Sequence, residues 1–219
     1  MRRCFNRHFT FTSSSSSSFN FIDGVLPATY TTPESFGIKV YPNFLNNDEE
    51  ESLISAADAA LKRRVFEEGH WDAVIKNYRE AQVLVSRLAP LARTATTRAA
   101  SNFPQGPLTG LPQAAVHFLE LSPSGEILAH VDSIKFSGGI VAGLCLLSDA
   151  VMLLTPEPPP QEGVMPIIKL LLPRLSLYTL SGTARFQWAH AIPSGSPLFK
   201  GKPIVRERRI SVMLRDELV

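Results

Sequence analysis

Short apolar runs separated by turn-forming residues dominate the second half of the chain. The runs with the length and composition of β-strands cover residues 115–121, 127–130, 140–147, 167–172, 175–180 and 210–214. Many short strands with turns between them are typical of an antiparallel barrel made of two sheets. The pattern therefore predicts a mostly β protein with flanking helices (α+β) and a double-stranded β-helix, or jelly-roll, core.

The first half adds one short strand, over 37–41, and two helices. The acidic stretch 46–51 leads into a helix over 52–62, and acids favour a helix N-terminus because of its dipole. Apolar residues recur there at helical spacing: Leu53, Ile54, Ala57 and Leu61. A second helix is predicted over 73–91. Proline-rich segments that cannot continue either element are predicted as loops: 101–112 and 155–160.

The composition fits one globular domain, predicted over residues 36–215. The chain has 219 residues, of which 44% are hydrophobic and 19% charged, as in a domain with a sizeable core. No apolar run reaches the roughly 18 residues of a membrane span, so we expect none. Two cysteines, Cys4 and Cys145, allow neither a disulfide framework nor a cysteine metal site, which fits a reducing compartment.

Residues 1–30 are predicted to be an organelle transit peptide and disordered tail. Their first part carries three arginines, a serine run at 13–18 and no acid before Asp23. Basic, hydroxylated and acid-poor N-termini are typical of transit peptides. We expect a mitochondrial destination, the matrix, ahead of a plastid. A merely disordered tail would have the same composition.

The charge balance bears on partners. Removing the three N-terminal arginines leaves 19 of the 22 Lys and Arg against 20 Asp and Glu. Proteins that grip duplex phosphates usually carry a basic stripe, and none is evident. The cluster 206–209 contains Glu207 and precedes a strand, so a loop with one functional arginine is favoured over a nucleic-acid patch. We therefore expect no duplex DNA; the macromolecular substrate is predicted to be protein, with RNA open.

Candidate metal ligands are His130, Asp132 and His190. Side chains two positions apart in an extended segment point to the same side, so His130 and Asp132 form a pair. His190 follows Asp132 by 58 positions, across several strand-like runs. Two histidines and one carboxylate form the facial triad that holds non-haem Fe(II) and leaves open positions. His-x-Asp alone usually marks a solvated loop; the third residue makes the metal site the better interpretation.

Arg209, Ser211 and Arg215 share one face of a predicted strand because side chains alternate. Two guanidiniums inside a barrel are costly unless an anion pairs with them. A dicarboxylate bound at the iron, such as 2-oxoglutarate, is a natural partner, since arginine binds carboxylates through paired hydrogen bonds. Tyr178, on the apolar strand 175–180, adds a phenol.

Four segments that contain these residues, 130–136, 177–180, 181–190 and 209–215, together resemble the AlkB-type Fe(II)/2-oxoglutarate dioxygenases. The continuation after Asp132 and the run from Arg209 resemble the mitochondrial branch of that family most. The resemblance implies a dioxygenase that uses Fe(II), 2-oxoglutarate as cosubstrate and O2. It places 2-oxoglutarate against a polar set: Tyr178, Arg209, Ser211 and Arg215.

No catalytic residue beyond the metal ligands is predicted. Arg185 either orients substrate or closes one end of the barrel, and Trp188 is expected to pack. His70 and His117 are interpreted as core or surface residues, the usual role of lone histidines.

The departures from the family concern the substrate. Nucleotide-repairing members carry Asn-x-Tyr where this chain has Leu119 and Leu121, and an Asn where it has Ser211. Since base chemistry needs a pocket for a flipped nucleotide, these changes favour hydroxylation or demethylation of a protein or other non-duplex substrate. Two alternatives remain: an RNA or DNA N-demethylase of the same fold, and a catalytically idle binding protein.

Overall fold

The structure, a computed structural model, describes residues 18–70, 73–101, 114–134 and 137–215. Its strands are β1 (Ile22–Asp23), β2 (Ile38–Tyr41), β3 (Ile75–Leu84), β4 (Ala115–His130), β5 (Ile140–Leu146), β6 (Ala150–Pro156), β7 (Ile168–Leu172), β8 (Leu177–Ser181), β9 (Trp188–Ile192), β10 (Leu198–Phe199), β11 (Lys202–Pro203) and β12 (Arg209–Arg215). Its α-helices are α1 (Pro33–Phe36), α2 (Asn47–Leu61), α3 (Pro90–Ala100) and α4 (Gly182–Phe186), with 3₁₀ turns at Ser18–Phe21 and Val85–Arg87.

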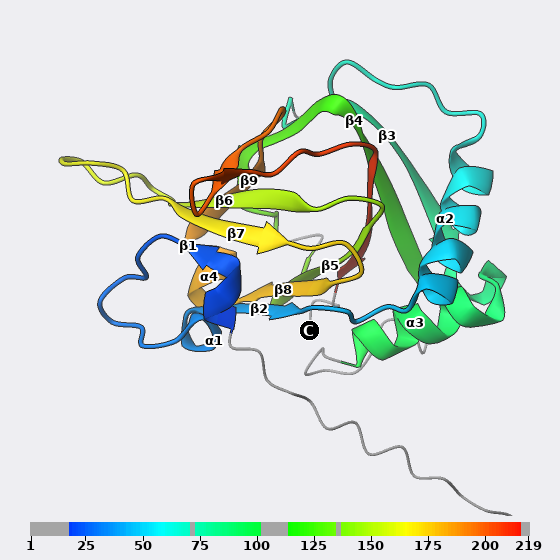
Figure 1. Cartoon of the computed structure of the whole chain (residues 1–219), viewed down its shortest axis with the longest axis horizontal. Coiled ribbons are helices and arrows are strands. Elements are labelled where there is room, and N and C mark those ends of the chain that lie inside the picture. The colour runs from blue at the N-terminus through cyan, green and yellow to red at the C-terminus, as the bar shows by residue number, and fades with distance from the viewer. Residues whose placement is uncertain (1–17, 71–72, 102–113, 135–136, 216–219) are drawn as a thin grey trace, which may run out of the picture.

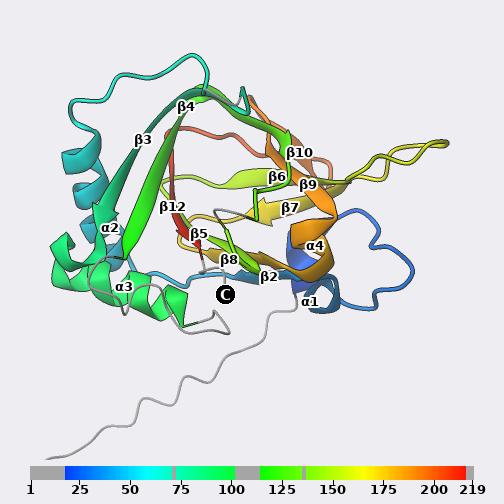
Figure 2. The same ribbon diagram turned by 180° about the vertical axis from the view of Figure 1, so that it is seen from behind.

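Ten strands form one curled antiparallel sheet in the order β1-β7-β6-β9-β4-β12-β5-β8-β2, with β3 on the other side of β4; β10 and β11 pair separately. β4 belongs to both walls of the barrel. Its first half pairs with β3 and β12, and its end pairs with β9, where His130 lies opposite His190. Figures 1 and 2 show the resulting curled sheet from opposite sides. The predicted jelly-roll core is confirmed.

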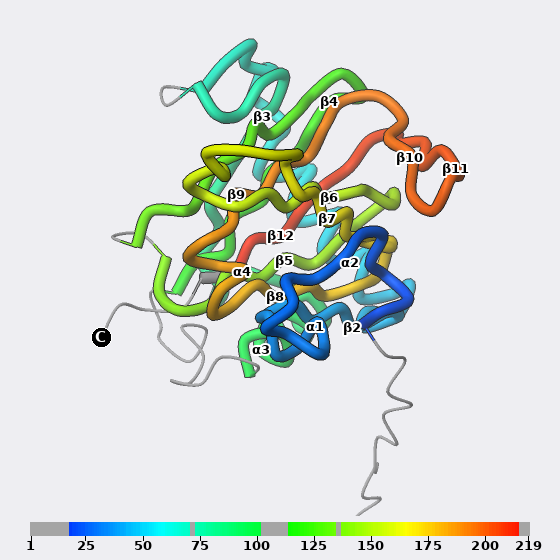
Figure 3. Tube along the Cα trace, turned by 90° about the vertical axis from the view of Figure 1, so that its left-hand side faces the viewer, coloured from blue at the N-terminus to red at the C-terminus, as the bar shows by residue number. Residues whose placement is uncertain are grey.

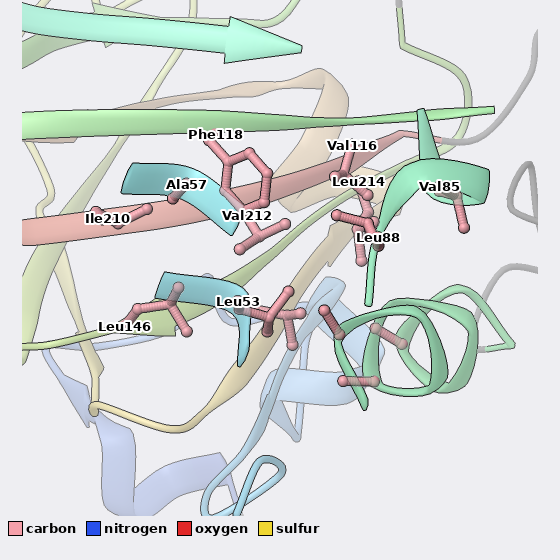
Figure 4. Close-up of a cluster of buried hydrophobic side chains, with 14 of the residues drawn as sticks. Leu53, Ala57, Val85, Leu88, Val116, Phe118, Leu146, Ile210, Val212 and Leu214 are labelled. Atoms are coloured by element: carbon pink, nitrogen blue, oxygen red, sulfur yellow. The ribbon is translucent and has the colours of Figure 1, made fainter. Parts of the chain in front are cut away.

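Helices α2 and α3 cover the outside of the β3–β4–β12 wall (Figure 1). Leu53 and Ala57 of α2 face Phe118 and Val212 of the sheet, and all four are fully buried (Figure 4). Burying a side chain the size of leucine contributes about 2 kcal/mol. This outer core holds the wall in place, so the opposite face of the same strands is free to shape the barrel interior.

The N-terminal residues from Ser18 pack along the other side of the barrel (Figure 3). β1 pairs with β7, and Ile22 is buried in the inner core. Phe36 meets the Trp188 ring edge-on, with centroids 5.2 Å apart, so Trp188 packs as expected. The described part of the 1–30 segment therefore belongs to the fold.

The prediction of a helix over 73–91 is wrong. Residues 75–84 form β3, which pairs with β4 along its length, because strand pairing outweighs weak local helix propensity. The helix starts later, at Pro90: proline suits a first helical position and disfavours a helical conformation in the residue before it. α2 likewise begins earlier than predicted, at Asn47.

Other boundaries also differ from the sequence patterns. The runs 115–121 and 127–130 are one continuous strand, β4, and the strands β6 and β9 were not predicted. β6 continues to Pro156, so the predicted loop 155–160 starts later. Most of the predicted loop 101–112 lies outside the described residues. No helix in the described ranges is long and apolar enough to span a membrane.

Candidate active site

His130, Asp132 and His190 meet at one end of the barrel. His130 ends β4, Asp132 lies in the loop that follows, and β9 carries His190. One potential ligand atom from each residue lies within 4.8 Å of the other two. The pairing of β4 with β9 thus brings together the three predicted metal ligands.

The carboxylate of Asp132 faces both imidazoles. Its Oδ1 lies 3.5 Å from His130 Nε2, and its Oδ2 lies 4.0 Å from His190 Nε2. Nδ1 of His130 donates a hydrogen bond to the carbonyl of Leu128 at 2.9 Å, so the lone pair is on Nε2. Two imidazole nitrogens and one carboxylate are a donor set that suits Fe(II).

His190 is held in the form that binds metals. Its burial, reinforced by the neighbouring His130, lowers the pKa of His190 to about 4. The imidazole is therefore neutral at pH 7, and only a neutral imidazole can ligate a metal ion.

Arg185 supports the loop that carries Asp132. It lies on α4 and is 2% exposed. Nη1 donates a hydrogen bond to the carbonyl of Asp132 at 2.9 Å, and Nη2 donates to the carbonyl of Ser137 at 3.2 Å. One buried guanidinium thus ties the loop after β4 to the segment just before β9.

The alternation predicted along β12 is present. Arg209, Ser211 and Met213 line the interior cavity. The residues between them, Ile210 and Val212, pack in the outer core under the helices. The two faces of one strand therefore serve two purposes, stability outside and chemistry inside. β12 ends at Arg215, whose side chain lies outside the described part of the structure.

Several donors on this inner face lack a partner within the described residues. Arg209 is 1% exposed, yet its Nε and Nη1 atoms have no hydrogen-bond acceptor there. The buried Ser211 hydroxyl likewise has no hydrogen-bond partner among the described residues. Burial raises the pKa of Tyr178 to about 12, so its phenol keeps its proton as a donor. Buried unsatisfied donors around a guanidinium are what an anionic ligand would satisfy.

Gly143 makes room for the phenol. It lies on β5 between Tyr178 of β8 and Met213 of β12. A Cβ at this position would lie 2.5 Å from Tyr178 Cε1 and 2.8 Å from the phenol oxygen. Only glycine lets the ring lie flat across β5.

A single cavity of about 510 Å³ joins these features. It is lined by the three candidate ligands and by Tyr178, Arg209 and Ser211. The residues present therefore fit both a metal ion and a dicarboxylate bound beside it.

Two curated relatives decide the family. The mitochondrial α-ketoglutarate-dependent dioxygenase AlkB homologue 7 of Bos taurus is 42% identical over 179 residues, and that of Mus musculus is 40% identical over 178 residues. Each alignment covers 81% of this chain and 77% of the relative. This chain belongs to the AlkB homologue 7 family. No model of a known protein family matches it.

Solved structures support the fold of this AlkB homologue 7 family member. The structure of OsALKBH1 is similar with a TM-score of 0.56 at 13% identity, over 82% of this chain and 98% of that one. A prolyl-4-hydroxylase from Pseudomonas putida is similar with a TM-score of 0.54 at 15% identity, over 84% and 95%.

The predicted enzyme class is thereby confirmed. As a member of the AlkB homologue 7 family, the protein is a 2-oxoglutarate-dependent dioxygenase that uses Fe(II), 2-oxoglutarate and O2. The family resemblance inferred from the segments 130–136, 177–180, 181–190 and 209–215 is confirmed with it. The idle binding protein is no longer favoured.

Sequence reasoning missed part of the cavity wall. Glu80, His70 and His117 line the same cavity as the candidate metal ligands. Glu80 lies on β3, which the sequence pattern assigned to a helix, so its direction could not be inferred. His117 stands two residues before Leu119 on β4, and this spacing was the available signal that both face inward.

Proposed function

We propose that this dioxygenase binds Fe(II) through His130, Asp132 and His190. We further propose that a second set binds 2-oxoglutarate: Tyr178, Arg209, Ser211 and Arg215. The observation that supports both assignments most is that one cavity joins the triad to a buried arginine with unsatisfied N–H groups. When bound, iron and 2-oxoglutarate together use O2 to oxidise a substrate C–H bond, with succinate and CO2 as coproducts.

The chain's own residues then have separate tasks. Arg209 offsets the charge of the distal carboxylate, and the Tyr178 and Ser211 hydroxyls add hydrogen bonds. His130, His190 and Asp132 would hold the metal ion, and such a facial triad leaves positions for cosubstrate and O2. Arg185 keeps the Asp132 loop in position.

The proposed reaction is hydroxylation or demethylation of a protein or another non-duplex substrate. Leu119 lines the cavity, and it is apolar where nucleotide-repairing members carry a polar residue. This supports a substrate other than a nucleotide base. The near-neutral charge of the domain points the same way. RNA demethylation is the alternative, and release of formaldehyde from methylated RNA would favour it over the protein substrate.

We propose a mitochondrial location, in the matrix, because both curated relatives are named mitochondrial. The dioxygenase domain at 36–215 is extended by the packed residues from Ser18, so a removable leader would end before that point. A reporter fused to residues 1–30 should enter mitochondria, and a cytosolic or plastid signal would contradict the proposal.

Succinate formation tests the site. The purified chain with Fe(II) and 2-oxoglutarate should produce succinate in air, and His130→Ala should abolish both metal binding and turnover. Circular dichroism checks that the variant remains folded. Turnover of 2-oxoglutarate at the parent rate in His130→Ala would show that the ligand assignment is wrong.

A further inference from the structure

Three ionisable side chains in the cavity belong to neither the metal set nor the 2-oxoglutarate set. Glu80 comes from β3, His117 from β4, and His70 from the segment that leads into β3. In the β3–β4 register, Glu80 lies opposite Leu119, and His117 lies two positions further along β4, opposite Gln82. The cluster therefore stands on the inner face of the wall that also carries Arg209.

One imidazole bonds the Glu80 carboxylate, and a second lies beside it. His117 Nε2 donates to Glu80 Oε2 at 2.7 Å, and His70 Nε2 lies 3.9 Å from Oε1. The Glu80 side chain is 30% exposed, against 16% for His117 and 15% for His70. The acid is therefore the most accessible of the three, and its bond to His117 fixes its direction.

The cluster is separate from the site for 2-oxoglutarate. On β12, Arg209 lies opposite Leu121 of β4, whereas Met213 lies opposite His117. Four residues along a strand span about 13 Å, which separates His117 from Arg209. Glu80 on β3 and Ser211 on β12 lie on opposite sides of Leu119 of β4, two strand spacings or about 10 Å apart. The wall thus carries a cation at Arg209 on β12 and an anion at Glu80 on β3, with Leu119 of β4 between the two strands.

The charge of Glu80 belongs neither to the proposed metal ligands nor to the proposed 2-oxoglutarate contacts. Among the described residues that line the cavity, the carboxylates are Glu80 and Asp132. Asp132 faces the two ligand histidines, and a dianionic cosubstrate would be repelled from Glu80. A negative charge among apolar neighbours such as Leu119 and Met213 favours a positively charged partner over a neutral one, because apolar walls screen the attraction poorly.

We propose that Glu80, oriented by His117 and flanked by His70, binds a cationic group of the substrate, an ammonium or a guanidinium. The proposal rests on the proposed function, since it assumes that this cavity receives the substrate. It narrows the substrate to molecules that carry such a cation near the carbon to be oxidised, as lysine and arginine side chains do. A simple strand-to-strand link between His117 and Glu80 is the competing explanation.

Matched probes that differ only in charge test the proposal. The full chain is loaded with Fe(II) and 2-oxoglutarate without oxygen, and the affinities of n-pentylammonium and 1-pentanol are measured by calorimetry. We expect the ammonium to bind the parent about tenfold or more tightly than the alcohol, as for a hydrogen bond to a charged group. Glu80→Gln keeps the size of the side chain, so it should remove this difference and leave the alcohol unchanged.

Glu126→Gln is the matched control. Glu126 lies on the same strand pair, pairs with Lys76 at 3.0 Å and is not among the residues that line the cavity. This variant should keep the preference for the ammonium. Two results would overturn the proposal: equal affinity of the parent protein for the two probes, or a preference for the ammonium that survives Glu80→Gln. The contact between His117 and Glu80 would then only link β3 to β4.

Two further measurements keep the outcomes distinct. If Glu80→Gln does not fold, the salt dependence of binding to the parent protein is measured instead. Raising NaCl from about 50 to about 500 mM should weaken binding of the ammonium and leave binding of the alcohol unchanged. A larger loss of affinity for the ammonium than for the alcohol would support the cation site. An equal loss for both probes would overturn it. Succinate formation in air is measured on the same protein. Succinate without probe discrimination overturns this inference alone, whereas discrimination without succinate overturns the proposed function.

Discussion

The guanidinium of Arg185 donates a hydrogen bond from Nη1 to the backbone carbonyl of Asp132 over 2.9 Å. The sequence left two roles open for Arg185, orienting substrate or closing the barrel. The contact shows a third possibility, support of a proposed metal ligand through its main chain. Since α4 leads directly into β9, Arg185 also connects the Asp132 loop to the strand of His190.

We predict that Arg185→Met weakens binding of Co(II), used as a spectroscopic substitute for Fe(II). A hydrogen bond to a charged group contributes about 1.5–3 kcal/mol, so the dissociation constant should rise about tenfold or more. Co(II) absorption during titration gives the constant. Arg185→Lys, which can still donate to one carbonyl, should recover part of the affinity.

The control for this prediction is Arg206→Met. Arg206 is 5% exposed and also donates to two backbone carbonyls, those of Pro123 and Gly125, but it does not line the cavity. Its loss should lower the melting temperature without changing the Co(II) constant. If both variants weaken Co(II) equally, Arg185 contributes only to general stability.

The second prediction concerns Arg209. Truncating one side of a buried charge pair costs about 2–5 kcal/mol, so Arg209→Ala should raise the apparent requirement for 2-oxoglutarate by about tenfold or more. Binding of Fe(II) should change little, because Arg209 lies outside the triad. Succinate formation at graded 2-oxoglutarate concentrations measures the effect. An unchanged requirement would leave Arg209 with a structural role only.

The third prediction concerns Gly143→Ala. The added methyl group would overlap the Tyr178 ring and push the phenol away from its position. We expect weaker 2-oxoglutarate binding by about tenfold, the range for losing one hydrogen bond to a charged group.

A double-mutant cycle identifies the cause. If Gly143→Ala acts by displacing the phenol, it should add little in a Tyr178→Phe background, because the hydroxyl is already gone. Additive losses would mean that the methyl group disturbs β5 and not the Tyr178 contact.

The sequence predicted the conformation of some strands and not of others. On β12, the period of two was enough to place Arg209 and Ser211 inside and Val212 outside, because an apolar outer face and a polar inner face alternate cleanly. On β3, the polar and small residues around Glu80 have no such alternation. Only the pairing with β4 gives them a strand conformation, and that pairing is a long-range contact.

The candidate metal site shows the same contrast. Residue types and spacing predicted His130, Asp132 and His190, although the strand β9 that carries His190 was not predicted. The Arg185 contacts could not be predicted, since they join a helix to the carbonyls of a distant loop. A main-chain acceptor cannot be recognised in a sequence, because every residue has a carbonyl group.

The last prediction concerns acid stability and Glu49. Glu49 is 7% exposed and accepts two hydrogen bonds from Arg98, at 2.6 and 2.8 Å. These bonds from Arg98 hold the pKa of Glu49 below its ordinary value of 4.5. A carboxyl group whose pKa is lower in the folded state stabilises the fold above its unfolded value, and this contribution disappears as the pH falls through the folded value. At pH 7, Glu49→Gln should therefore lower the free energy of unfolding by about 1 kcal/mol, because Arg98 is partly exposed. Urea unfolding at steps from pH 7 to pH 3 should show the parent and the variant converging below about pH 4.5. Parallel curves across that range would mean that the Glu49 charge does not contribute to stability.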